Sequence, residues 1–391
     1  MERNGALRTT TLFVAVMLAA VTTTTAAPAQ AASTIAFQPA RYIATGHSGT
    51  DSLAVADVTG DSRPDIVVGV GAAHNGETSS LLVYAQQPDR TYGSPRRIVG
   101  HGGYGGEVRV AVGDIDGDGR TDAALSTPGG IDVFYQRSNQ LAAPLLVGIG
   151  AEDVALTDMT GDGRLDIVAA VTHGTVLIYP QNGSSTFGAA TTVSGPADSG
   201  VPRTQVFTAD LNGDSRPDVA QFYGKGTWVR LQQAGGAFGP ATTHLIAPDA
   251  DGYRWPSGGA AVGDLTGDGR SDLMMTAEAN ISHSAVNVFA QRGGALAVTP
   301  VTYPAYDSAM GMAVGDLTRD GRSDLVVAHS GWQAISVRAQ QADASLGAYQ
   351  LIEANGIVPA IDGVAIADLS GDGKPDIVSV VYQGLVLLIQ K

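Results

Sequence analysis

Seven short segments of the sequence each carry three aspartates at a fixed spacing. Aspartate occupies positions 1, 5 and 9 of every nine-residue segment. The segments are DVTGDSRPD (57–65), DIDGDGRTD (114–122), DMTGDGRLD (158–166), DLNGDSRPD (210–218), DLTGDGRSD (264–272), DLTRDGRSD (316–324) and DLSGDGKPD (368–376). Closely spaced carboxylates on a short loop repel one another without a cation, and oxygen is the ligand atom that Ca²⁺ prefers. The sequence therefore predicts up to seven structural calcium sites.

Each predicted site has a further side-chain oxygen at position 3 and a position-7 residue whose backbone carbonyl is available. Glycine at position 4 or 6 permits a tight turn. In the sixth segment Arg319 takes the place of the position-4 glycine. The predicted side-chain ligands are Asp57, Thr59, Asp61, Asp65, Asp114, Asp116, Asp118, Asp122, Asp158, Thr160, Asp162, Asp166, Asp210, Asn212, Asp214, Asp218, Asp264, Thr266, Asp268, Asp272, Asp316, Thr318, Asp320, Asp324, Asp368, Ser370, Asp372 and Asp376.

Two other kinds of loop are alternatives to a calcium site in these segments. A single segment of this kind could be an ordinary Asp-Gly turn, but seven in register weaken that interpretation. An EF-hand needs glutamate at position 12 and flanking helices. The twelfth positions here are Val68, Leu125, Ala169, Gln221, Met275, Val327 and Ser379.

The segments recur with a period near 52 residues, and strand-like sequence flanks each of them. Runs such as 110–113 precede a segment, and β-branched runs such as 65–68 follow it. A third strand ends in a V-x-x-Q pattern, as at Val83 and Gln86, and an aromatic-Gly-small turn, as at 92–94, opens a fourth. Four strands per repeat, seven times, predict an all-β fold, a seven-bladed β-propeller with four-stranded antiparallel blades. A solenoid is the alternative, and it would leave two open ends that need caps.

The two ends of the chain predict how the ring closes. The seventh repeat stops at Gln390 and Lys391, after its third strand. Residues 37–43 match the fourth-strand start at 238–241 in residue type and order. We therefore expect the N-terminal strand to complete the last blade and to remove both free sheet edges.

The loops, the four-strand repeat and the aromatic-Gly signal resemble the FG-GAP/VCBS repeat family of integrin α-subunit propellers and some lectins, in a secreted bacterial form. The resemblance covers residues 32–391. It implies calcium in the loop that joins strands 1 and 2 of a blade, and ligand binding on the opposite face. Position 3 departs from the family's Asp or Asn in five loops, where it is Thr or Ser. Because a neutral hydroxyl is a weaker ligand, we expect affinities of about 10⁻⁴–10⁻³ M at several sites.

Composition and charge limit the partners. The net charge is −15, but the seven loops hold 22 of the 38 acidic residues. Seven Ca²⁺ ions would bring the charge close to neutrality, so acidity does not indicate a cationic partner, and no basic patch indicates nucleic acid. There is no cysteine and therefore no disulfide.

The N-terminal segment 1–31 is predicted to be a secretory signal peptide. It has a basic start at Arg3 and Arg8, an apolar run at 11–21, and a small-x-small cleavage signal at 29–31. An uncleaved anchor is the alternative, but the apolar run is short for a membrane span. The mature domain, 32–391, is expected to be extracellular, without membrane insertion, and monomeric.

The repeats differ most in the loops predicted for the face opposite the calcium loops. Histidines, aromatics and acids gather there, which suits a surface where rings stack on sugars and polar groups bind hydroxyls. Ordinary polar loops without a ligand are the alternative interpretation. The candidate ligand-binding residues are His74, His101, Tyr104, His173, Tyr253, Trp255, His283, Tyr306, His329 and Trp332.

Two classes of function remain open. The first is a lectin-like or adhesion module that binds glycans or extracellular protein partners. The second is a polysaccharide lyase or hydrolase with its active site on the same face. The sequence contains no G-x-S-x-G, no H-E-x-x-H and no cysteine nucleophile, which favours the binding module. A histidine-tyrosine pair for β-elimination remains open, because two such residues need only converge in space and leave no sequence motif. No catalytic residue is assigned.

Overall fold

The structure is a computed structural model of the 391-residue chain. It describes residues 35–46, 50–71, 78–102, 106–171, 174–183, 185–196, 204–224, 226–246, 248, 258–277, 283–330, 334–353, 363–381 and 384–391. All of them lie in one compact unit, Thr34–Lys391. The predicted signal peptide 1–31 lies outside the described residues and remains a prediction.

The described residues form seven four-stranded antiparallel sheets and contain no helix. This confirms the predicted all-β, seven-bladed propeller. The blades, from the inner to the outer strand, are β2 (Thr50–Ala56), β3 (Asp65–Val70), β4 (Ser80–Tyr84), β5 (Arg96–Val99); β6 (Val110–Gly113), β7 (Asp122–Thr127), β8 (Gly130–Phe134), β11 (Leu145–Val147); β12 (Asp153–Thr157), β13 (Asp166–Val171), β14 (Thr175–Tyr179), β15 (Thr191–Ser194); β16 (Thr204–Ala209), β17 (Asp218–Tyr223), β18 (Gly226–Arg230), β19 (Thr242–Leu245); β20 (Ala260–Gly263), β21 (Asp272–Ala277), β22 (Ala285–Phe289), β25 (Val301–Pro304); β26 (Ala309–Gly315), β27 (Asp324–His329), β28 (Ala334–Arg338), β29 (Gln350–Glu353); and β30 (Val364–Ala367), β31 (Asp376–Val381), β32 (Gly384–Leu388), β1 (Arg41–Ala44). Two short hairpins, β9 (Gln136–Arg137) with β10 (Gln140–Leu141) and β23 (Gln291–Arg292) with β24 (Ala295–Leu296), project from the second and fifth blades.

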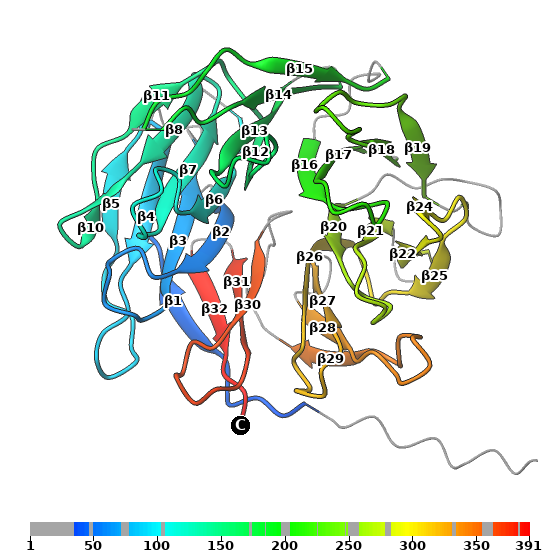
Figure 1. The fold of residues 1–391 in the computed structure, drawn as a ribbon. Helices are drawn as coiled ribbons and strands as arrows, with labels where there is room; N and C mark the ends of the chain where they lie inside the picture. Colours follow the sequence, from blue (N-terminus) through cyan, green and yellow to red (C-terminus); the bar gives the residue numbers. More distant parts are fainter. Residues whose placement is uncertain are drawn as a thin grey trace, which may run out of the picture. The chain divides into compact units, whose positions relative to one another are not determined.

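The N-terminal strand closes the ring. Strand β1 pairs antiparallel with β32, from Arg41 opposite Leu387 to Ala44 opposite Gly384. A bridge between Phe37 and Gln390 continues the pairing toward the chain end. In Figure 1 the blue β1 lies beside the red β32. The predicted completion of the last blade by the N-terminal strand is confirmed.

The hydrophobic core lies between blades rather than within one layer. Seven clusters of buried side chains each combine residues of two consecutive blades, and one of them joins the first blade to the seventh. In that cluster Val68 and Leu82 of the first blade pack with Leu385 of the seventh. Because the middle strands are covered on both faces, β3 and β31 are buried along their whole length, whereas β5 buries one residue in four. A cyclic core excludes the open-ended solenoid.

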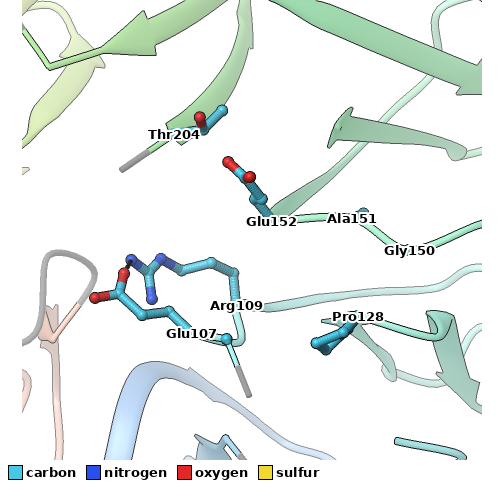
Figure 2. Close-up of a pocket in the computed structure, with 8 residues that line it drawn as sticks. Glu107, Arg109, Pro128, Gly150, Ala151, Glu152 and Thr204 are labelled. Carbon is cyan, nitrogen blue, oxygen red and sulfur yellow. Dashed lines mark hydrogen bonds and ion pairs between the residues drawn. The ribbon is translucent and has the colours of Figure 1, made fainter. Parts of the chain in front are cut away.

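The inner strands β2, β6, β12, β16, β20, β26 and β30 form a closed series in which each contacts the next. Each is followed by one of the aspartate loops, which therefore lie at the C-terminal ends of the inner strands. A cavity lies at the other end, beside the N-terminal ends of β6, β12 and β16 (Figure 2). No described helix is long and apolar enough to cross a membrane.

The glutamine of the V-x-x-Q pattern links neighbouring blades. In five blades its buried side-chain Nε2 donates to the backbone oxygen of position 2 in the preceding blade's aspartate loop. The donors are Gln86, Gln181, Gln232, Gln340 and Gln390. The bond from Gln86 to Leu369, 2.8 Å long, spans the junction of the first and last blades. The Nε2 atoms of Gln136 and Gln291 have no hydrogen-bond partner among the described residues.

We expect Gln86→Ala to lower the free energy of unfolding by about 1–3 kcal/mol, because the Leu369 carbonyl loses its partner in a buried setting. Urea unfolding of the full propeller measures this loss. Gln87→Ala is the matched control, because Gln87 is exposed and its side chain bonds only to the nearby Ala85 carbonyl. Equal effects of the two substitutions would show that the link between blades does not stabilise the ring.

Candidate functional site

The aspartate loops share one backbone conformation. In six loops the position-1 carboxylate accepts the backbone N–H groups of positions 4, 5 and 6, as Asp114 does from Gly117 (2.8 Å), Asp118 (3.0 Å) and Gly119 (2.8 Å). In the sixth loop Asp316 accepts those of positions 5 and 6. Positions 4 and 6 have positive φ in all seven loops. The tight turn predicted from glycine at these positions is therefore present in every blade.

Three non-glycine residues occupy these left-handed positions. Arg319 has φ 60° at position 4 of the sixth loop, and Ser62 and Ser215 have φ 62° and 65° at position 6. The left-handed conformation costs a residue with a Cβ about 1–2 kcal/mol. The sixth loop keeps both positive φ values, but its position-2 N–H, on Leu317, donates to the Gly315 oxygen at 3.0 Å instead of to the position-9 aspartate.

The position-9 aspartates are fully buried and tie three parts of a blade together. One oxygen of each accepts the backbone N–H of the V-x-x-Q glutamine, at 2.7–3.0 Å. The other oxygen accepts N–H groups at the start of the loop, as Asp122 does from Ile115 at 2.9 Å. Each carboxylate thus connects the loop, the start of the second strand and the end of the third strand.

Burial raises the pKa of every position-9 carboxyl group. Loss of solvation is the largest cause, and the backbone N–H donors oppose it. The pKa of Asp122 and of Asp218 rises to about 6. A cation beside these groups would favour their charged form.

Several position-3 oxygens fit a bound cation. Asp116 Oδ1 and the hydroxyls of Thr59, Thr266 and Thr318 are buried, and none has a partner at hydrogen-bond geometry. The three hydroxyls nevertheless lie close enough to the position-9 carboxylates to lower their pKa. Buried hydroxyl and carboxylate oxygens that lie beside a carboxylate are oxygen ligands of the kind that Ca²⁺ takes.

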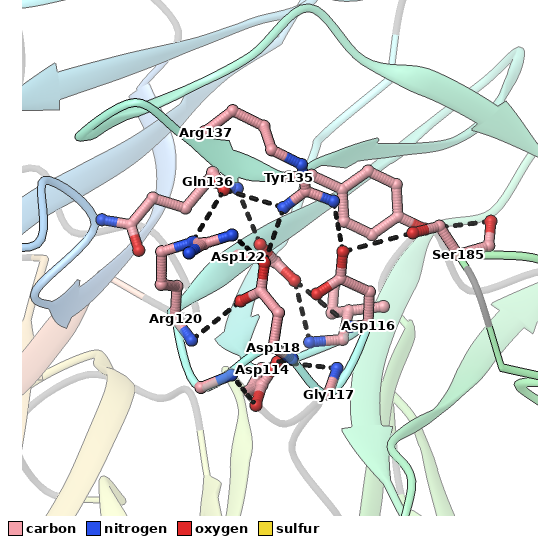
Figure 3. A network of polar contacts seen from close by, with 12 residues as sticks. Asp114, Asp116, Gly117, Asp118, Arg120, Asp122, Tyr135, Gln136, Arg137 and Ser185 are labelled. Atoms are coloured by element: carbon pink, nitrogen blue, oxygen red, sulfur yellow. Dashed lines mark hydrogen bonds and ion pairs between the residues drawn. The ribbon is translucent and has the colours of Figure 1, made fainter.

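The second loop, drawn in Figure 3, has four aspartates, whereas each of the other loops has three. Asp114, Asp116 and Asp122 each place one oxygen within 4.8 Å of the others. Arg137, from the β9–β10 hairpin, pairs with Asp116 Oδ2 and reaches Asp118 at 3.0 Å. Because Arg137 binds the Oδ2 atom, Asp116 Oδ1 is left for a cation.

A basic residue at position 7 neutralises part of each loop's charge. Its side chain pairs with the position-5 aspartate in all seven loops, through Arg63, Arg120, Arg164, Arg216, Arg270, Arg322 and Lys374. Five of these arginines also donate to the backbone oxygen of the V-x-x-Q glutamine. The sequence analysis missed this role, although the repeated basic residue at position 7 was visible in it.

The cavity at the opposite end of the inner strands has a volume of about 330 Å³. Its lining residues are Gly106, Glu107, Arg109, Pro128, Gly150, Ala151, Glu152 and Thr204. They come from the segments that precede β6 and β12, from the first residue of β16 and from the β7–β8 turn. Figure 2 shows Glu107 and Arg109 on one side of it, with Glu152 and Thr204 on the other.

An ion pair dominates one wall of the cavity. Arg109 Nη2 donates to Glu107 Oε2 at 2.6 Å, and the Arg109 side chain is only 3% exposed. Its Nη1 atom lies 3.4 Å from the Asp51 carbonyl oxygen. Burial raises the pKa of the Asp51 carboxyl group to about 7, while the charge of Arg109 lowers it and that of Glu107 raises it further. The wall therefore contains one guanidinium held between acidic groups.

This end of the ring breaks the repeat symmetry. Five residues before the first loop aspartate, the second, third and fourth blades have Arg109, Asp153 and Gln205. The same position holds Gly259, Gly311 and Gly363 in the last three blades. At this position, therefore, polar side chains occur in the second, third and fourth blades and glycine in the last three, whereas the aspartate loops are alike in every blade.

Four of the ten candidate ligand-binding residues are described. The backbone N–H and Nδ1 of His101 both contact the buried carboxylate of Asp132, the Nδ1 contact being 2.6 Å, and the imidazole is 45% exposed. His283 and Tyr306 are partly buried. The remaining six lie outside the described residues: His74, Tyr104, His173, Tyr253, Trp255 and Trp332.

The sequence predicted that His329 lies in a surface loop, and this prediction is wrong. It is the last residue of β27 and is fully buried. Its Nδ1 contacts the Asp307 carbonyl oxygen at 2.5 Å and its Nε2 contacts Ser336 Oγ at 2.7 Å. Burial lowers its pKa to about 4. Both ring nitrogens are therefore engaged inside the protein, and neither is left to bind a ligand. The role of His329 is structural.

Asp51 makes stability depend on pH. Its folded pKa, about 7, lies above its ordinary value of 3.8, so the folded state holds a proton that the unfolded chain releases. The contribution of Asp51 to the free energy of unfolding is therefore complete below pH about 4 and is lost as the pH rises to about 7. We expect Asp51→Asn to reduce the fall in stability between pH 5.5 and 8, measured by urea unfolding at saturating Ca²⁺. An equally steep fall in the variant would contradict the assignment to Asp51.

Comparison with known proteins places these features in a family. The FG-GAP-like repeat pattern matches residues 158–221, 210–275, 264–327 and 319–379, and the FG-GAP repeat pattern matches residues 49–84 and 108–141. No curated protein matches the chain.

Among solved structures, an Agrocybe aegerita lectin, described for its specific recognition of non-reducing terminal N-acetylglucosamine, is 25% identical. The match covers 78% of this chain and 81% of that chain, with a TM-score of 0.57. Two structures of BBS1N in complex with ARL6DN, soaked with mercury or lead, are 10% and 11% identical. They cover 91% and 90% of this chain and 96% of theirs, with TM-scores of 0.57 and 0.55, and they show the fold alone.

The matched repeats extend over more than half of the chain and coincide with the aspartate loops and the strands around them. The chain therefore belongs to the FG-GAP repeat family.

Proposed function

We propose that this FG-GAP propeller is a secreted carbohydrate-binding module whose ligand face lies at the N-terminal ends of the inner strands. The observation that carries the proposal is the likeness to the N-acetylglucosamine-recognising lectin, at 25% identity over 78% of the chain. The two proteins share a fold, with a TM-score of 0.57. One fold can bind different ligands when its loops differ.

The choice of face follows from what the two ends of the inner strands offer. The aspartate loops repeat almost unchanged, and their polar groups are used within the loop. The opposite end carries the cavity and the side chains that differ between blades. A single binding site needs side chains that differ between blades. Identical side chains in all seven blades would instead create seven equivalent positions around the ring.

We further propose that the aspartate loops hold structural Ca²⁺. The support is the set of buried position-3 oxygens beside the position-9 carboxylates, and the three converging carboxylates of the second loop. The ions would reduce repulsion among the loop aspartates and stabilise the strand connection in each blade. The number of ions is at most seven, with the strongest site expected in the second loop.

A polysaccharide lyase or hydrolase is a second candidate, and one observation favours it. The buried Asp132 orients His101 through Nδ1, so Nε2 of the half-exposed ring points away from that contact. A carboxylate that fixes an imidazole in this way supports general-base chemistry. His74, Tyr104 and His173, which could join such a site, lie outside the described residues.

Chelation should lower the melting temperature of the propeller. A site saturated at 100 times its Kd contributes about 2.7 kcal/mol to stability, so removal of several ions has a large summed effect. Thermal melts with Ca²⁺, with Mg²⁺ and with EDTA measure it, and the smaller Mg²⁺ should restore little. An unchanged melt in EDTA would contradict structural calcium.

The second loop allows this metal proposal to be tested at one site. Tyr135 lies beside the carboxylates in Figure 3, so it should sensitise the luminescence of Tb³⁺ bound as a calcium analogue. Tyr135→Phe defines the share of the signal that comes from this loop. Asp116→Ala should remove the same share, and Ca²⁺ should compete for it. Luminescence that survives Asp116→Ala would place the ion elsewhere.

A glycan array with and without Ca²⁺ tests the proposed binding function. We expect binding to a subset of glycans and its loss in EDTA, because the scaffold needs its ions. Eluted glycans are then checked for cleavage. Absence of binding to every glycan would contradict a carbohydrate-binding module. Cleavage that His101→Ala and Asp132→Asn both abolish would instead establish the enzyme.

A further inference from the structure

The cavity opposite the aspartate loops has the dimensions of a small-ligand site. Its volume of about 330 Å³ lies within the range of about 300–1,000 Å³ that is typical of such sites. Pro128 and Ala151 provide apolar surface, and Glu107, Arg109, Glu152 and Thr204 provide polar groups. A few polar groups on a mostly apolar wall give a ligand both contact area and orientation.

The cavity favours a cationic ligand over an anionic one. Among the described lining residues the one guanidinium is that of Arg109, which is already bound to Glu107 and to backbone oxygens. Glu152, on the facing wall in Figure 2, has no side-chain partner among the described residues. An anion would meet both carboxylates, whereas an ammonium group would meet an uncompensated charge at close range.

The same cavity offers contacts suited to a sugar. Glu107 is fixed by Arg109, so its carboxylate oxygens are held in place to accept bonds from hydroxyl groups. The Thr204 hydroxyl makes no hydrogen bond with other described residues, and it both donates and accepts. Pro128 and Ala151 line the cavity and offer apolar surface to the face of a sugar ring.

Resting on the proposed carbohydrate-binding function, we infer that this cavity binds an amino sugar with a free ammonium group, such as a glucosamine unit, with Glu152 pairing with the ammonium. Charge-assisted hydrogen bonds to a carboxylate are about twice as strong as neutral ones. Acetylation of the amine removes the charge and adds bulk, so the N-acetylated sugar loses this interaction. The repeat asymmetry agrees with a single site, because the last three blades place glycine where the second to fourth have polar side chains.

Calorimetric titration of the full propeller with a glucosamine trimer and with its fully N-acetylated counterpart tests the inference. We expect the free amine to bind about tenfold more tightly or better. Glu152→Gln should remove this preference without changing the melting temperature, because the Glu152 side chain supports no described contact. Asp89→Asn is the matched control, since it also removes one negative charge but from an exposed hairpin outside the cavity.

Further arms separate the possible failures. Spermidine tests the ammonium group without a sugar, and equal affinity for spermidine would overturn recognition of an amino sugar. Binding of both trimers with no preference for the amine, or a preference that survives Glu152→Gln, would overturn the inference but leave the carbohydrate-binding function intact. Failure of every glycan to bind would overturn the proposed function itself.

Discussion

Seven buried aspartates, one at the ninth position of each loop, connect the strands on which the propeller depends. Each accepts backbone N–H groups from the start of its loop and from the end of the third strand, so one side chain fixes the relative positions of three strands. The adjacent glutamine extends this arrangement to the preceding blade in five of seven cases. Burial of the carboxylate has a cost in solvation, which its N–H donors offset in part and which the proposed cations would offset further. The position-9 aspartate and the adjacent glutamine thus connect the strands of one blade, connect that blade to the preceding one, and lie beside the proposed metal site.

Closure of the ring distributes the hydrophobic core evenly. No blade buries both of its faces alone, and every cluster of buried side chains combines two consecutive blades. The pairing of β1 with β32 completes the seventh blade, so the last junction resembles the others. This symmetry constrains the loop end of the propeller strongly. It constrains the opposite end less, because linkers there connect an outer strand to the next inner strand and tolerate differences in sequence. The cavity with Arg109 and Glu152 lies at this less constrained end.

Charge is used differently at the two ends. In the aspartate loops, acidic side chains converge and are balanced by the basic residue at position 7, and in the second loop also by Arg137. At the cavity, a single buried arginine orients one glutamate, while a second glutamate faces it across the space. The first arrangement suits an ion that stabilises the scaffold. The second suits a ligand with hydroxyl and ammonium groups.

The sequence by itself determined the blade count, the strand order and the closure by residues 37–43, because a repeat with period-2 strands and fixed loop residues specifies local structure in every copy. It also located the aspartates and the two tight-turn positions. It did not show that His329 is buried, since a histidine at a strand end looks the same whether it faces solvent or a neighbouring blade. The link from Gln86 to Leu369 and the meeting of Glu107, Arg109 and Glu152 depend on how the blades are arranged around the ring. No local sequence pattern predicts a contact between residues that are far apart in the chain, or between residues that have no counterpart in the other repeats. Only the tertiary structure decided these contacts.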